Sequence, residues 1–127
     1  MTLDALLQQL DPAPAPANDG LLFAEVLATI AAHYTYTPQA FQNGVGEDCV
    51  HNPAGTNEGS CKVFAFGQLQ GLDEAQTLAC FAEHYRKVLA TPEATDHANI
   101  RTFMRHGWAG VRFEGEALTT KPSTMSE

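Results

Sequence analysis

The sequence of 127 residues lacks a long hydrophobic run and a basic leader. Its longest uncharged apolar stretches, Leu21–Ala24 and Val26–Ala32, are too short for a transmembrane helix. Asp4 lies where the basic region of a secretory signal peptide would carry Lys or Arg. We therefore expect a soluble protein without a membrane partner.

Positive charge is scarce and unevenly placed. There are 7 Lys and Arg residues against 15 Asp and Glu residues, so the formal net charge is −8, and residues 1–61 contain no Lys or Arg. A chain with this balance repels phosphate backbones, which argues against nucleic acid as a partner. The hydrophobic content of 44% is that of a globular protein, and the length suits one domain with one core.

Cysteine is present only three times, as Cys49, Cys61 and Cys80, and no Cys-x-x-Cys pair occurs. An odd number of cysteines without a secretion signal indicates reduced thiols and a cytoplasmic protein. Cys49, His51 and Cys61 could bind a metal, but their spacing fits no standard zinc pattern. We therefore expect no metal and no cofactor.

The first third of the chain combines a helical arm, a spacer and a second helix. Leucines at helical spacing predict a one-sided helix over Thr2–Leu10, and alternating Pro and Ala then favour an extended spacer. The arm either docks its leucines on the body or offers them to a partner. Asp19 can cap a helix that runs to about His33, and Tyr34–Thr37 has strand propensity.

The segment after residue 59 fits either a helix or a strand. We prefer a helix over residues 60–69, because Ser60 offers a cap and Gly71 a stop. Asp73–Leu89 has the pattern of one continuous helix, with Gln76 completing a capping box at its start.

The last expected elements are a helix and a strand. Asp96 is the expected cap of a helix that ends at His106. Gly110–Glu114 alternates and could pair with Tyr34–Phe41. The sum is an α+β fold, a mainly helical single domain with a small antiparallel sheet. Its expected parts are an arm and linker (1–17), a globular domain (18–118) and a flexible tail (119–127).

The irregular loop Asn43–Gly59 and the helix start after it carry the candidate chemistry. A helix that starts at Ser60 would attract anions and lower the pKa of Cys61, the candidate nucleophile, with His97 as its base. The catalytic candidates are thus Cys61 and His97. The binding candidates are Asn52, Asn57, Ser60, Lys62, Asn99 and Arg101. Alternatively, Cys61 is a small buried residue in a loop of turn-forming glycines.

A second candidate surface lies on the last helix. His97, Arg101 and Arg105 recur at a spacing of four residues and therefore share one face. This face either binds an anion or acidic partner or pairs with the acidic first half of the chain.

Several motifs between residues 20 and 118 together resemble the HopJ family of type III effector proteins. They are Phe41-x-Asn43-Gly44, Asn52-x-x-Gly55-x-Asn57-x-Gly59-Ser60-Cys61-Lys62-x-Phe64-x-Phe66, Thr77-Leu78-x-Cys80-Phe81, Asp96-His97-x-Asn99-Ile100-Arg101-x-Phe103-Met104 and Gly107-Trp108-x-Gly110. The family takes its name from proteins that plant-pathogenic bacteria deliver into host cells. The resemblance carries no catalytic residue over to this chain.

Three functions follow from these observations. The first is a small soluble HopJ-like protein of the bacterial cytoplasm that binds a protein or small molecule. The second is a small enzyme or anion-binding protein that uses Cys61 and His97 near the loop. The third is an effector secreted by a type III system, although the N-terminal segment reads as a helix with an early acid and no serine.

Overall fold

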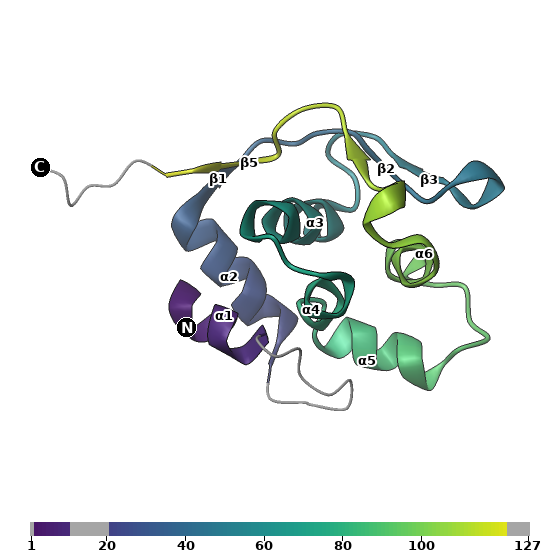
Figure 1. Cartoon of the computed structure of the whole chain (residues 1–127), viewed down its shortest axis with the longest axis horizontal. Coiled ribbons are helices and arrows are strands. Elements are labelled where there is room, and N and C mark those ends of the chain that lie inside the picture. The colour runs from purple at the N-terminus through teal and green to yellow at the C-terminus, as the bar shows by residue number, and fades with distance from the viewer. Residues whose placement is uncertain (1, 11–20, 122–127) are drawn as a thin grey trace, which may run out of the picture.

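The computed structural model describes residues 2–10 and 21–121 (Figure 1). The helices of this part are α1 (Leu3–Leu10), α2 (Phe23–His33), α3 (Glu58–Gln70), α4 (Glu74–Ala79), α5 (Glu83–Ala90) and α6 (Ala98–His106). Short 3₁₀ turns are η1 (Gly46–Asp48) and η2 (Gly107–Gly110). The strands are β1 (Tyr34–Tyr36), β2 (Phe41–Asn43), β3 (Val50–Asn52), β4 (Arg112–Phe113) and β5 (Leu118–Thr120). The fold is therefore α+β and mainly helical, as expected.

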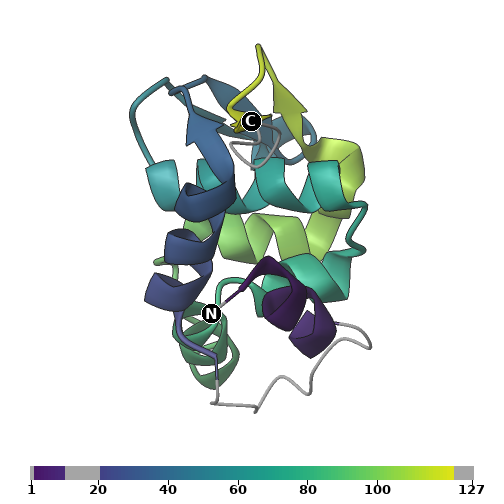
Figure 2. The same cartoon turned by 90° about the vertical axis from the view of Figure 1, so that its left-hand side faces the viewer.

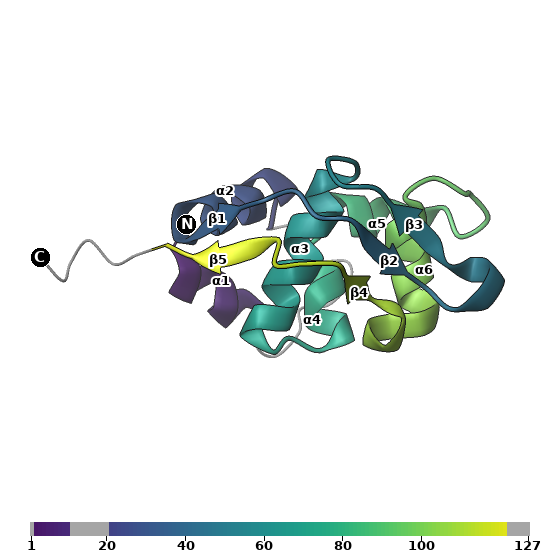
Figure 3. The same ribbon diagram turned by 90° about the horizontal axis from the view of Figure 1, so that it is seen from above.

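Helix α3 is the centre of the molecule. The strands cross above it, α4 and α5 lie below it, and α2 and α6 flank it (Figures 1 and 3). This enclosure explains why Phe64 and Phe66 are both fully buried although they lie on different sides of the helix. The ring of Phe64 alone contacts four aromatic rings, with centroids 5.0–6.3 Å away, those of Phe41, Phe81, Phe103 and Trp108.

The helix expected over residues 60–69 is confirmed, but its start is not at Ser60. Helix α3 begins at Glu58, and its N-cap is Asn57, whose φ of 48° is left-handed. Ser60 therefore lies inside the first turn and does not cap the helix. At the other end Gly71 has a φ of 67° and stops the helix as expected, because glycine adopts this conformation without steric cost.

Two small antiparallel sheets cover α3, with strand orders β1-β5 and β3-β2-β4. Phe113 pairs with Phe41, so the expected contact between these segments is confirmed in part. Tyr34–Tyr36, however, pairs with Leu118–Thr120. The first two residues of the expected flexible tail, 119 and 120, thus belong to a strand, and residues 122–127 lie outside the described part.

The single helix expected over Asp73–Leu89 is wrong. The capping box between Asp73 and Gln76 is present, with the Gln76 N–H donating to Asp73 Oδ1 over 2.8 Å, but α4 ends at Ala79. Helix α5 starts at Glu83 after Ala82, whose φ is 54°. The break sets the two helices in different directions (Figure 1) and buries the intervening residues 80–82 in the core.

Helices α6 and α2 also have N-caps other than the expected ones. Helix α6 begins at Ala98 with His97 as its N-cap, so Asp96 is not the cap; its carboxylate accepts a hydrogen bond from Arg101 instead. Helix α2 begins at Phe23 with Leu22 as its N-cap, so the expected cap Asp19, which lies outside the described residues, is not its N-cap.

The N-terminal arm docks on the body. Leu6 and Leu10 are fully buried, and α1 packs against α2 (Figure 2). The side chain of Gln76 also donates a hydrogen bond to the Leu10 carbonyl over 2.9 Å. Of the two alternatives for the arm, the structure shows the docked one. In the described segments, no helix combines the length and apolarity that crossing a membrane requires.

Candidate functional site

Four asparagines from separate elements form one hydrogen-bonded network. Asn99 Oδ1 accepts from Asn43 Nδ2 over 3.0 Å and from Asn52 Nδ2 over 3.2 Å, and Asn99 Nδ2 donates to Asn52 Oδ1 over 2.9 Å. Asn57 Nδ2 donates to the same Asn52 oxygen over 2.6 Å. The network therefore ties strands β2 and β3 to the starts of α3 and α6.

Three of the four asparagines are closed to solvent, and the fourth, Asn57, is exposed. Asn43, Asn52 and Asn99 are only 0–6% exposed. Buried amides stabilise a fold only when their donors and acceptors are paired, and here one acceptor, Asn43 Oδ1, has no protein partner. The network thus fixes the geometry of the neighbouring helix starts.

Positive backbone φ angles concentrate at the starts of α3, α5 and α6. In the described part of the chain, the non-glycine residues with positive φ are Asn57 (48°), Ala82 (54°) and His97 (53°). Each is the N-cap of a helix, and its carbonyl accepts the first helical hydrogen bond of α3, α5 or α6. Such conformations cost about 1–3 kcal/mol each and gather at functional sites. They therefore make this end of the molecule the candidate functional site.

A pocket of about 330 Å³ lies between these three helix starts. Its polar lining comes from Asn57, Ser60, His84, His97 and Asn99. Its apolar lining includes Phe23, Phe81 and Ile100. The cavity therefore offers both polar groups and an apolar wall, the usual make-up of a small-molecule site.

The electrostatics of the pocket come from α3 and α6. The first N–H group that donates within α3 is that of Cys61, so the N–H groups of Gly59 and Ser60 have no acceptor in the helix. In α6 the first is that of Arg101, so the same holds for Ala98–Ile100. First-turn N–H groups have no acceptor inside their helix and carry partial positive charge. This side of the pocket therefore favours a negatively charged group.

Two histidines of the pocket lining, His84 and His97, lie next to one another. The ring centroids of His84 and His97 are 5.2 Å apart, and both side chains are half-buried. The ring of Phe23 packs edge-on against His84 at 4.8 Å. His84 was not among the expected site residues, because in one continuous helix it has no reason to approach His97.

The structure brings most of the expected site residues together. Asn57, Ser60, Asn99 and His97 line the pocket, and Asn52 supports them from behind through Asn57 and Asn99. Lys62 lies elsewhere, with its Nζ 4.6 Å from the ring centroid of Tyr36.

Cys61 does not have the environment of a nucleophile. Its side chain is buried, and its Sγ is 3.8 Å from the Gln39 carbonyl oxygen. The expected lowering of its pKa is wrong, because burial raises the pKa of this thiol. Cys61 packs toward Gln39 and Tyr36 instead of lining the pocket with His97. It matches the alternative of a small buried residue.

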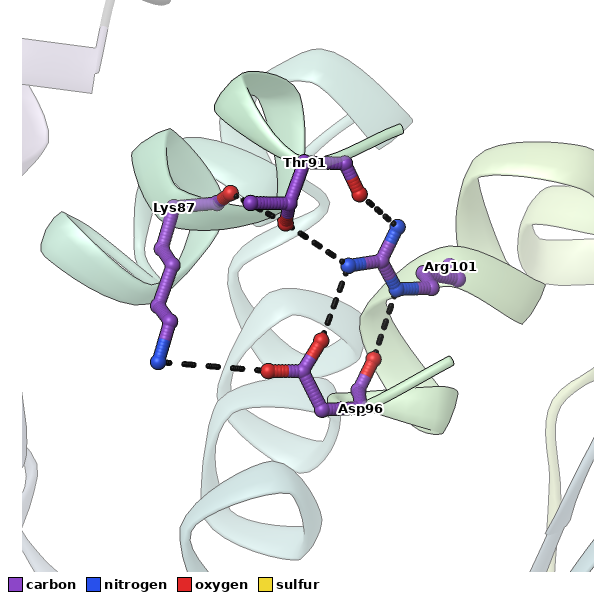
Figure 4. A network of polar contacts seen from close by, with 4 residues as sticks. All are labelled: Lys87, Thr91, Asp96 and Arg101. Carbon is purple, nitrogen blue, oxygen red and sulfur yellow. Dashed lines mark hydrogen bonds and ion pairs between the residues drawn. The ribbon is translucent and has the colours of Figure 1, made fainter. Parts of the chain in front are cut away.

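Arg101 serves the fold beside the pocket (Figure 4). Its guanidinium donates to the Thr91 carbonyl over 2.8 Å and to the Asp96 carbonyl over 2.6 Å, and it pairs with the Asp96 carboxylate at 2.9 Å. The hydrogen bond from Arg101 also holds the pKa of Asp96 below its usual range. Because the Arg101 side chain is only 10% exposed, it closes the loop before His97 rather than offering a site for an anion.

Arg105 is the third residue of the face that the sequence predicts from His97, Arg101 and Arg105. It pairs with Asp48, from the first half of the chain, at 3.7 Å. His106 also contacts the Asp48 carboxylate at 3.0 Å, and this hydrogen bond lowers the Asp48 pKa. The face therefore pairs in part with the acidic first half of the sequence, which was one of the two alternatives.

Comparison with known proteins gives a family model and a solved structure. The model described as "HopJ type III effector protein" matches residues 3–118. The crystal structure of VPA0580, described as a protein of unknown function, is 46% identical in sequence, covers 95% of each chain and superimposes with a TM-score of 0.84. No curated protein matches the sequence significantly.

Proposed function

The chain belongs to the HopJ type III effector protein family, and from this premise we propose that it is a small-molecule binding protein whose ligand occupies the pocket between α3, α5 and α6. The observation that carries the proposal is the pocket itself, about 330 Å³ in size, which lies between the starts of α3, α5 and α6 and is lined by the N-caps Asn57 and His97, both left-handed. A preorganised binding site accounts for the strained backbone of His97 beside the pocket.

The chemistry of the pocket selects a class of ligand. The starts of α3 and α6 favour an anionic group, and Phe23 and Phe81 favour an apolar or aromatic body. We therefore propose a small organic anion, such as an aromatic carboxylate. Binding is preferred to catalysis by Cys61 and His97, because the Cys61 thiol is buried and its pKa is raised.

The test is a titration of the full chain with benzoate, followed by amide NMR shifts. We expect the largest shifts at Gly59, Ser60 and Asn99. Acetate and inorganic phosphate serve as anions without an aromatic body, and we expect the same amides to respond more weakly to them. Shifts spread over other surfaces, or none at all, would refute the proposal.

A pair of variants makes the test specific. Ala98 is exposed at the pocket, so Ala98→Leu places a bulky side chain in the cavity. Ala90 is exposed at the end of α5, outside the pocket lining, so Ala90→Leu is the matched control. We expect at least a tenfold loss of benzoate affinity in the first variant and none in the second. Equal affinities would place the binding elsewhere.

The proposal also includes the place of action, which is the cytoplasm of the producing cell. The competing function is an effector delivered into a host cell, which the family description favours. Fusing residues 1–25 to a reporter in a type III-competent strain separates the two. Retention of the reporter supports the cytoplasmic role, and export contradicts it.

A further inference from the structure

We propose that His84 and His97 together bind a divalent transition-metal ion of the zinc type at the edge of the pocket. This inference deepens the proposed function, since it names a cofactor class for the same site. The two rings lie on different elements, His84 in the first turn of α5 and His97 at the cap of α6. A sequence motif therefore could not have revealed the pair, and the sequence alone led us to expect no metal.

The separation of the ring centroids is compatible with coordination of one ion by both rings. With zinc–nitrogen bonds of about 2.0–2.1 Å, two imidazoles on one tetrahedral ion have ring centres about 5 Å apart. The centroids of His84 and His97 are 5.2 Å apart. In the described part of the chain, neither ring makes a hydrogen bond with another residue, so their nitrogens are available as ligands.

The backbone of His97 and the ring of His84 are held in place before any ion arrives. The Arg101 N–H donates to the His97 carbonyl over 3.1 Å, and the Arg101 side chain ties down the preceding Asp96. His84 is packed against Phe23 and follows the strained Ala82. A metal site gains affinity when its ligands need little reorganisation, and this arrangement supplies that condition.

The charged groups around His84 and His97 affect how well a metal ion binds there. The Glu83 carboxylate interacts electrostatically with His84 and favours a cation, and the Asp96 carboxylate interacts with His97 but is also paired with Arg101. The starts of α3 and α6 oppose a bare cation. No group of three or more His, Cys, Asp or Glu residues in the described segments is arranged to hold a metal. The protein thus supplies two imidazoles, and water or the anionic ligand completes the coordination.

The test is calorimetric titration of the full chain with Zn²⁺ alone, in a buffer free of chelators and phosphate. We expect one site in the micromolar range. His84→Gln and His97→Asn should each weaken binding at least tenfold; Asn is chosen at position 97 because it tolerates the left-handed cap. The controls His33→Gln and His51→Gln change exposed histidines outside the pocket lining and should bind as the wild type does.

A second measurement needs no variant. Paramagnetic Cu²⁺ at substoichiometric amounts should first broaden the ring resonances of His84 and His97 in the wild-type chain. Absence of Zn²⁺ binding, unchanged binding in both pocket variants, or first broadening at other histidines would overturn the inference. If benzoate still shifts the pocket amides in that case, the metal site fails alone and the proposed binding function stands.

Discussion

The asparagine network allows a prediction of coupling between Asn43 and Asn99. Asn99→Ala removes three side-chain hydrogen bonds and Asn43→Ala removes two. At about 1 kcal/mol for each bond, the free energy of unfolding falls by about 3 and about 2 kcal/mol. The bond from Asn43 Nδ2 to Asn99 Oδ1 is lost in both variants. The double variant should therefore lose about 4 kcal/mol instead of about 5, which is a coupling of about 1 kcal/mol.

Urea unfolding followed by the fluorescence of Trp108 measures these values. Trp108 is the one tryptophan of the sequence, and its ring packs against Phe64 and Phe103 in the core. For the control, Thr2→Ala removes a hydrogen bond to the Ala5 N–H in α1, at the opposite end of the molecule from α6 (Figure 1). When Thr2→Ala is combined with Asn99→Ala, the two losses of unfolding free energy should add. A coupling of zero between Asn43 and Asn99 would show that the network does not act as a unit.

Further predictions concern packing, charge and thiols. Gly110→Ala should lower the free energy of unfolding in urea by about 1–3 kcal/mol or more, because its Cβ would lie 2.7 Å from a backbone nitrogen. Arg101→Lys should cost about 2 kcal/mol in the same assay, since an ammonium cannot replace the guanidinium fork. Below about pH 4, the usual pKa of an aspartate, the wild type should lose stability as the pH falls through the lowered pKa of Asp96, and Asp96→Asn should remove that part of the loss. With a thiol reagent near pH 8, the half-exposed Cys49 should react first and the buried Cys61 slowly; fast reaction of Cys61 would contradict its burial.

The sequence predicted best what short-range contacts decide. The capping box of Asp73 and Gln76 and the glycine stop at Gly71 are settled by residues within one turn, and both are present. The break between α4 and α5 at Ala82 could not be predicted from neighbouring residues in the sequence. It depends on the packing of Phe81 against Phe64 and Phe23, which belong to other helices.

The same division applies to the site. The composition of the loop Asn43–Gly59 pointed to Asn52 and Asn57, because asparagines in an irregular segment need partners, whereas Asn99 was expected on the last helix beside His97. Helix-start chemistry was expected to activate Cys61, but the true start at Glu58 and the burial of the thiol remove that effect. His84 was missed because it approaches His97 only once the chain has turned at Ala82.

The docked arm has a consequence for any route that exports this chain. An N-terminal signal can be read only while its segment is detached from the body, and detaching α1 exposes Leu6 and Leu10 to water. At about 1.5–3 kcal/mol for each leucine, detachment costs about 3–6 kcal/mol. Roughly one molecule in a hundred to one in ten thousand would then present the segment at any moment. Recognition after folding would be limited by this opening, so an exporter would have to capture the chain during its synthesis or with the help of a chaperone.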